Sequence, residues 1–183
     1  MTATTLDAKT ALILVDLQKG IVGLPTAHPI DEVVAHAAEL ATAFRAHDLP
    51  VVLVRVTGGA PGRNETPGGR GTPPADWAEL VPELGRQDSD IVVTKQTWGA
   101  FHGTDLDMQL RRRGVTQVVL GGVATAIGVE STARSAYEHG YHVTIATDAI
   151  TDMDAEMHRN SVERVFPRLG ESDTAAAIIE LLG

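Results

Sequence analysis

Short apolar runs recur along this chain and alternate with segments in which apolar residues follow helical spacing. Each run is continuous rather than interleaved with polar residues, which is typical of a strand buried on both faces of a parallel sheet. The pattern therefore predicts a three-layer α/β/α fold with a mostly parallel sheet. The 183 residues are expected to form a single domain, residues 1–183. The predicted strands are residues 11–15, 51–54, 91–93, 118–120 and 142–146.

Helical patterns fill most of the segments between these runs. Residues 57–74 are different, because ten of the eighteen residues are Gly or Pro, which favours an irregular loop. Such a loop is either a linker between two domains or a functional lid or wall of one domain. The strands that continue on both sides at short spacing favour the lid or wall. The predicted helices are residues 31–47, 76–84, 104–113, 126–139, 154–169 and 175–182.

The net charge of −9 argues against a nucleic acid or an acidic membrane surface as partner, since neither is attracted to such a protein. It still allows a small anion in a locally basic pocket. The sequence has no cysteine, which excludes disulfides, thiolate catalysis and cysteine-based zinc sites. The first apolar run is too short for a signal or membrane segment and no basic region precedes it, so we expect a cytoplasmic protein.

Three chemically distinctive positions follow predicted strands, at the sheet edge where ligands of such folds bind. Asp16 follows the first strand, Lys95 the third, and the glycine-rich residues 121–128 the fourth. Taken alone, each has a plain structural explanation: a turn residue, a solvated charge, or close packing of a helix on the sheet. Their coincidence predicts that Lys95 tunes Asp16 for acid–base chemistry. Thr125 is expected to cap the next helix, with Gly128 among its free N–H groups.

Several sequence motifs occur in order over nearly the whole chain. They are Val15-Asp-Leu-Gln18, Thr94-Lys-Gln-Thr-Trp-Gly-Ala-Phe101, Gly103-Thr-Asp-Leu106, Gly122-Val-Ala-Thr-Ala-Ile-Gly128, Ser131-Thr-Ala-Arg134, Gly140-Tyr-His-Val143 and Thr147-Asp-Ala149. This set resembles the isochorismatase-like hydrolases. The resemblance implies a parallel sheet of five or six strands and a small-molecule substrate. Because members of that family are commonly dimers or larger assemblies, it also implies a homo-oligomer.

The resemblance implies that Asp16 and Lys95 are catalytic. It also implies a cis peptide bond between Val123 and Ala124, in a turn that directs backbone N–H groups toward the substrate oxygen. Gly128 stands where most of the superfamily has a cysteine nucleophile. Covalent acyl transfer through a thioester, the usual route of the superfamily, is therefore not possible for this chain. Some isochorismatases that have glycine at this position cleave a vinyl ether, which requires protonation of a carbon and attack by water but no nucleophile. The expected substrate-binding residues are Gln18, Arg70, Trp98, Phe101, Val123 and Ala124.

The sequence predicts neither a metal site nor a cofactor. Nicotinamidases of the superfamily bind a divalent ion through an Asp–His–His set after the second strand, whereas residues 55–59 contain no Asp or His. Asp154 and His158 are four residues apart, a spacing that places two side chains on one helix face. An acidic helix start explains Asp154 without a metal. The glycines of residues 121–128 form neither a dinucleotide-binding motif nor a P-loop.

The sequence therefore predicts a hydrolase of a small cyclic or conjugated metabolite, with Asp16 as proton donor and Lys95 as its partner. Isochorismate and its analogues, whose hydrolysis gives pyruvate, fit this chemistry. Their two carboxylates would be received by Arg55, Arg63, Arg70 or the charge of Lys95. A second hypothesis is a family member that has lost turnover and binds a small molecule or a protein partner. A third is an amide hydrolase in which water replaces the cysteine.

Overall fold

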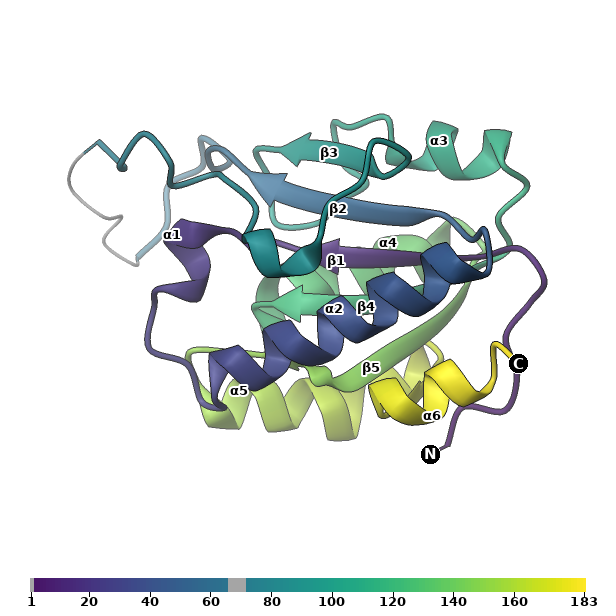
Figure 1. The fold of residues 1–183 in the computed structure, drawn as a ribbon. Coiled ribbons are helices and arrows are strands. Elements are labelled where there is room, and N and C mark those ends of the chain that lie inside the picture. The colour runs from purple at the N-terminus through teal and green to yellow at the C-terminus, as the bar shows by residue number, and fades with distance from the viewer. Residues whose placement is uncertain (1, 66–71) are drawn as a thin grey trace.

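The computed structural model describes residues 2–65 and 72–183 and shows a six-stranded sheet between helical layers (Figure 1). All neighbouring strands are parallel, in the order β3-β2-β1-β4-β5-β6. The strand order reverses between β1 and β4, which is where such sheets form ligand sites. The predicted α/β fold class is confirmed. The strands are β1 (Thr10–Val15), β2 (Val51–Val56), β3 (Ile91–Lys95), β4 (Gln117–Val123), β5 (His142–Thr151) and β6 (Glu171–Asp173).

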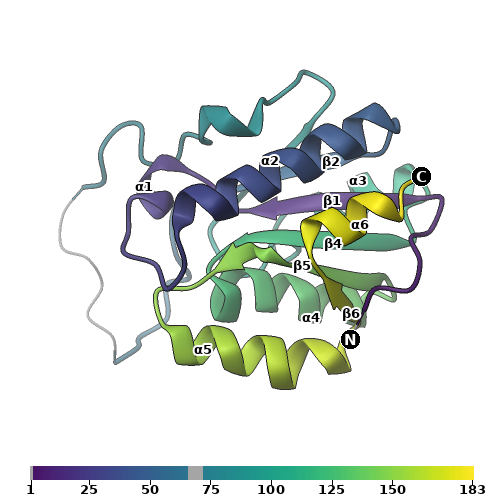
Figure 2. The ribbon, with the colours of Figure 1, turned by 60° about the horizontal axis from the view of Figure 1, so that its bottom comes forward.

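Helices cover both faces of the sheet (Figure 2). On one face, Leu40 of α2 and Ile178 of α6 belong to the same apolar cluster as Leu12 of β1. On the other, Leu106 of α3 belongs to the same cluster as Ile13 of β1. Within the described part of the chain, no helix has both the length and the apolar character of a membrane span. The helices are α1 (Lys19–Val22), α2 (Ile30–Ala46), α3 (Leu106–Arg112), α4 (Glu130–Glu138), α5 (Ala155–Asn160) and α6 (Ala175–Glu180).

Strand β1 is the centre of the sheet and contributes to both apolar clusters. It lies between β2 and β4, and all six of its residues are buried. Ile13 and Val15 face the cluster under α3 and α4, whereas Leu12 and Leu14 face the cluster under α2. This alternation is the ordinary two-residue period of a strand. Because both faces are buried, the strand appears in the sequence as a continuous apolar run.

The second half of the sheet extends beyond the predicted strands. β5 continues to Thr151 and pairs with β4 along most of its length. The register of this pairing shifts between Leu120 and Gly122, and after the shift Gly122 pairs with Ile150. The apolar pattern does not predict β6 (Glu171–Asp173), whose three polar residues pair with β5 at the edge of the sheet. These residues are only partly buried. An edge strand with one neighbour therefore needs no continuous apolar run to be held in place.

One predicted helix, 76–84, is not continuous in the structure: it forms a turn and then a single 3-10 turn that begins at Pro82, and a residue before proline is disfavoured in the helical conformation. The predicted helix 154–169 is helical without a break over residues 155–168, but its hydrogen bonding changes from α in α5 to π and then to 3-10 in the turn that contains Pro167. These short turns are Pro82–Leu84, Ser161–Val165 and Phe166–Arg168.

Gly122 marks a close approach between β4 and β1. Its φ is +118°, and an added Cβ would overlap the backbone carbonyl oxygen of Val15. Because backbone atoms in the sheet centre have little room to move, we expect Gly122→Ala to lower the free energy of unfolding by more than about 3 kcal/mol. Urea denaturation measures this change through the transition midpoint.

Gly140→Ala is the matched control for this variant. Gly140 also has a positive φ, +83°, but an added Cβ there would meet nothing within 4 Å. Its expected cost is therefore only the conformational one, about 1 kcal/mol. Similar losses in the two variants would show that the backbone angle, rather than the approach of β4 to β1, explains the glycine at position 122.

Candidate active site

The carboxyl ends of β1, β2, β3 and β4 point to the same edge of the sheet (Figure 1). Asp16 directly follows β1, and Lys95 is the last residue of β3. Although β2 lies between these strands, Nζ of Lys95 is 2.7 Å from Oδ2 of Asp16, and the two groups form an ion pair. The Lys95 and Asp16 side chains are only 2% and 8% exposed. The structure therefore brings these two predicted residues into direct contact in a buried place.

Asp16 has an unusual backbone conformation and an incompletely bonded carboxylate. Its φ of +53° is uncommon for a residue other than glycine, and its N–H donates to the carbonyl oxygen of Val54 at 2.9 Å. Oδ2 accepts from Lys95, whereas the buried Oδ1 has no hydrogen-bond partner among the described residues. Burial raises the pKa of Asp16 to about 6, and the charge and hydrogen bond of Lys95 oppose this rise. Asp16 is thus a carboxyl group poised to exchange a proton near neutral pH.

The Lys95 ammonium has a second partner in the loop that follows β3. Nζ donates to the carbonyl oxygen of Thr97 at 3.1 Å, and the Thr97 hydroxyl donates to the carbonyl oxygen of Gly99 at 3.0 Å. An ammonium group has three N–H donors, and the described residues take two of them. The loop therefore fixes the direction of Lys95 and leaves one donor for a ligand oxygen.

Gly128 lies in the turn after β4 and faces Asp16. A Cβ added at Gly128 would be 3.3 Å from Oδ2 of Asp16 and 3.0 Å from Cγ1 of Val15, which are both tight contacts. Close packing against β1 therefore explains the glycine. The peptide bond between Val123 and Ala124 at the start of this turn is cis, and both residues are almost fully buried.

The turn continues into α4 through a π-helical segment, Thr125–Val129. The prediction that Thr125 caps the helix is wrong: Thr125 is the first residue of this segment, and its hydroxyl lies 2.9 Å from Nδ1 of His158. The Ala126 N–H, a donor without a partner inside the helix, is accepted by Oδ2 of Asp152 at 2.8 Å. A carboxylate from the end of β5 therefore takes the place of a local cap.

Two residues that hold the turn are not identified by the sequence patterns. Asp152 directly follows β5 and is almost fully buried, and its only sequence signal is this position after a strand. Thr132 in α4 donates its hydroxyl to the carbonyl oxygen of Gly128 at 2.7 Å and accepts the Ala100 N–H at 3.1 Å. It thereby joins the turn to the loop that directs Lys95. No feature of the sequence distinguishes Thr132 from an ordinary helix residue.

The Asp154–His158 spacing is explained by two unrelated sets of hydrogen bonds. Asp154 is the N-cap of α5, and its Oδ1 accepts the N–H groups of Glu156 and Met157. His158 contacts the Thr125 hydroxyl. In residues 2–65 and 72–183, no group of three or more His, Asp or Glu side chains is placed to hold a metal ion.

Gln18 is fully buried, and backbone groups occupy its side-chain amide. Oε1 accepts the Val56 N–H at 2.8 Å, and Nε2 donates to the carbonyl oxygens of Val56 and Trp77 at 3.1 and 3.2 Å. The side chain therefore ties the end of β2 to the segment around Trp77. This arrangement supports the wall of the site and leaves little of the amide for a ligand.

The other expected binding residues have contrasting surroundings. The Phe101 ring is buried, with its centroid 5.1 Å from that of His139 and 6.0 Å from that of Tyr141. It belongs to the apolar cluster under α3 and α4. Trp98, by contrast, is 67% exposed. Arg70 lies outside the described residues.

A cavity of about 460 Å³ opens at the carboxyl ends of β2 and β3. Arg55, near the end of β2, donates Nε to the Thr94 hydroxyl on its wall at 3.0 Å. Hydroxyl, amide and imidazole groups thus surround a space next to the loop that directs Lys95. The polar residues of its lining are Thr57, Thr94, Gln96, Thr97 and His102.

The fold and the site together define a class of protein: a parallel α/β/α domain with a buried carboxyl–ammonium pair where its strand order reverses. The isochorismatase domain matches residues 10–177, nearly the whole chain, and the protein belongs to the isochorismatase family. Members of this family are hydrolases.

Two relatives extend over almost the whole chain. The uncharacterised isochorismatase family protein YwoC of Bacillus subtilis is 49% identical over 182 residues, covering 94% of this chain and 93% of that protein. The uncharacterised isochorismatase family protein YecD of Escherichia coli O157:H7 is 45% identical over 187 residues, covering 97% and 98%. Among solved structures, an isochorismatase family protein from Burkholderia thailandensis has a TM-score of 0.95 and 44% identity, covering 99% of both chains. These names state a family and no substrate.

Lys95 lowers the pKa of Asp16, so replacing it should raise that pKa. In Lys95→Met the burial of the carboxyl group remains but the opposing charge is lost, and we expect the Asp16 pKa to rise from about 6 to about 7 or higher. The carboxyl carbon signal of labelled aspartate, followed by NMR over a pH series, measures it. Lys19→Met is the matched control, since Lys19 pairs with Asp76 and Glu79. An unchanged Asp16 pKa in Lys95→Met would contradict the proposed coupling.

Proposed function

We propose that this protein hydrolyses the vinyl ether of a small carboxylate metabolite, isochorismate or a close analogue, by acid–base chemistry at Asp16. The observation that carries this proposal is the buried Asp16 carboxyl group, with one oxygen free of partners and a pKa raised to about 6. With this pKa, about half of the Asp16 carboxyl groups carry a proton at pH 6 and about a tenth at pH 7, far more than for an ordinary aspartate, and a general acid needs that proton. Its free oxygen supplies a position from which the proton can leave.

In the proposed reaction, Asp16 transfers its proton to the terminal CH₂ carbon of the vinyl ether. This forms a methyl group and an oxocarbenium ion. Water adds to the cationic carbon and returns a proton to the Asp16 carboxylate, which restores the acid. The resulting hemiketal breaks its carbon–oxygen bond to release pyruvate and the ring alcohol. Lys95, 2.7 Å from Oδ2, stabilises the carboxylate that exists between the two proton transfers.

The proposed reaction has no covalent enzyme intermediate, which agrees with glycine at position 128. A side chain there would begin 3.3 Å from the Asp16 carboxylate and 3.0 Å from Val15, so it would crowd the proposed acid. For an amide hydrolase the same position would have to supply a nucleophile, and glycine has none. The Gly128 contact therefore favours vinyl-ether hydrolysis over amide hydrolysis.

Isochorismate carries two carboxylates, and Lys95 has only one N–H donor left beside those that contact Asp16 and Thr97, so a second cation is needed. Arg55 is a half-buried cation near the end of β2, and only its Nε has a described partner, the Thr94 hydroxyl. Its remaining donors suit a carboxylate held in the neighbouring cavity. We further propose that the protein acts as a homo-oligomer, and that Trp98, which is 67% exposed, lies in contact with substrate or with a second subunit.

Turnover of isochorismate, measured as pyruvate release, tests this function directly. We expect kcat/KM to fall about tenfold per pH unit above about 6, because the reaction requires protonated Asp16. In deuterium oxide, the pyruvate methyl group should gain one deuterium from solvent, which reports protonation at carbon. Asp16→Asn should abolish turnover, whereas Asp105→Asn, an exposed change outside the site, should leave it intact.

Two outcomes would contradict the proposal. Full activity of Asp16→Asn would remove the proposed acid. A folded protein that binds isochorismate, as an increase in Tm would show, but releases no pyruvate would instead support the binding role without turnover.

A further inference from the structure

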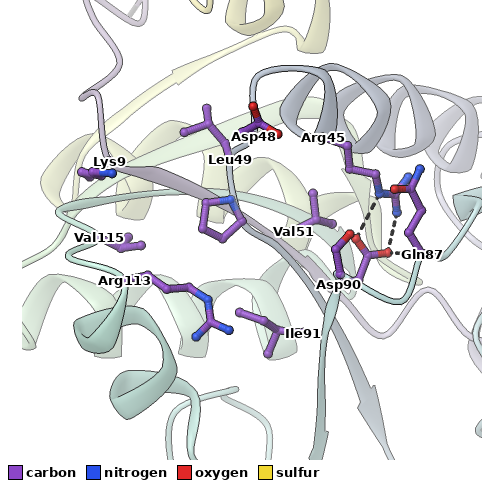
Figure 3. A pocket seen from close by; sticks show the side chains of 12 residues that line it. Lys9, Arg45, Asp48, Leu49, Val51, Gln87, Asp90, Ile91, Arg113 and Val115 are labelled. Atoms are coloured by element: carbon purple, nitrogen blue, oxygen red, sulfur yellow. Dashed lines mark hydrogen bonds and ion pairs between the residues drawn. The ribbon is translucent and has the colours of Figure 1, made fainter.

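A second cavity lies at the opposite edge of the sheet, where β2 and β3 begin (Figure 3). Its volume is about 500 Å³, which is within the usual range for small-molecule pockets. Lys9, which lines it, directly precedes β1, whereas Asp16 directly follows that strand. The length of β1 therefore separates this cavity from the acid–base pair by roughly 20 Å.

An ion pair between Arg45 and Asp90 forms one wall of this cavity. Nε and Nη2 of Arg45 lie 3.0 and 2.8 Å from the two carboxylate oxygens of Asp90 (Figure 3). The Asp90 side chain is almost fully buried and also accepts the Gln87 N–H at 2.8 Å. Its charge is thus satisfied by fixed partners and does not repel an anion in the cavity.

Two further cations, Lys9 and Arg113, line the cavity, and neither forms an ion pair with a described residue. Arg113 donates Nη1 to the backbone and side-chain oxygens of Gln109, and its Nε and Nη2 have no described partner. Asp48 is the remaining carboxylate of the lining. The cavity is therefore net positive, opposite in sign to a chain with 15 basic and 24 acidic residues.

Apolar side chains form the rest of the lining. Leu49 and Pro50 lead into β2, Ile91 begins β3, and all three are partly exposed. An inorganic anion would use the cations and leave this apolar surface in contact with water. A ligand with both an anionic group and an apolar body would cover it.

We propose that this cavity binds a small organic carboxylate. The carboxylate group lies at the guanidinium of Arg113, which points toward Ile91, while Lys9 adds positive charge from another part of the lining (Figure 3). The apolar body of the ligand lies on Leu49, Pro50 and Ile91. The planar guanidinium of Arg113, with Nε and Nη2 available, matches the two oxygens of a carboxylate. This binding site is separate from the acid–base pair, and its existence does not depend on the reaction proposed there.

Methyl NMR of the full chain tests the proposal with benzoate as the probe. Ile91 and Val115 report the cavity, and Ile145, a buried residue of the sheet core, serves as the internal reference. We expect benzoate to shift the two cavity signals saturably at roughly millimolar concentration. Benzamide has the same ring without the charge, and phosphate has the charge without the ring. Each should bind about tenfold more weakly or worse.

Variants assign the binding to the proposed cations. Arg113→Gln should weaken benzoate binding by about tenfold, because it removes the guanidinium that contacts the carboxylate, and Lys9→Gln should weaken it less, because it removes only a more distant positive charge. Arg112→Gln is the matched control, since it removes the same charge one residue earlier in the chain and outside the cavity lining. It should leave the Kd within about twofold of the original value.

The proposal is overturned if benzoate causes no saturable shift of the cavity signals, or if Arg112→Gln weakens binding as much as Arg113→Gln. Equal binding of benzamide would exclude recognition of the charge, and equal binding of phosphate would exclude recognition of the apolar body. Cavity signals that depend on protein concentration without any probe would show that a second copy of the chain covers this face.

Discussion

The arrangement of the candidate site depends on the buried ion pair between Asp16 and Lys95 at the carboxyl ends of the strands. Removing two charges from water costs several kcal/mol per ion unless each finds close compensation. The 2.7 Å contact and the Thr97 carbonyl oxygen provide that compensation only in part, since Oδ1 of Asp16 has no partner among the described residues. Because the pair joins the ends of β1 and β3 across β2, it forms only when all three strands are in register. Incomplete compensation of this kind is expected where binding or chemistry requires it.

The turn opposite the pair has supports of its own, and they come from other strands and helices. Asp152 at the end of β5 accepts the Ala126 N–H, and Thr132 in α4 joins Gly128 to Ala100. Both side chains are buried, so water does not compete for these hydrogen bonds. The positions of the acid–base pair and of the turn are therefore set by separate hydrogen bonds that meet in the loop after β3.

The sequence predicts those strands and helices whose formation depends mainly on residues close together in the chain. β1 is recognisable because both of its faces are buried, which leaves a continuous apolar run, and the interruption of the predicted helix 76–84 coincides with Pro82. The edge strand β6 has too few buried positions to leave such a pattern.

The same limit applies to the site. Asp16 and Lys95 are predictable as a pair because parallel strands end at one edge. Thr125 has the residue type of a cap, but its hydroxyl contacts His158, 33 residues away, and a distant carboxylate accepts the neighbouring N–H. Gln18 is similarly occupied by distant backbone groups. Such partners are fixed by tertiary packing, so local propensities do not reveal them.

Glycine at position 128, in a chain without cysteine, also bears on how the candidate site responds to oxidants. A thiolate that is accessible and reactive enough to attack a substrate is also the group most readily oxidised or alkylated. The sequence contains no cysteine, and a carboxyl–ammonium pair has no atom that peroxide converts under ordinary conditions. Without a cysteine, this chain can undergo neither glutathionylation nor disulfide exchange. The Asp16–Lys95 pair is therefore indifferent to the redox state of its surroundings.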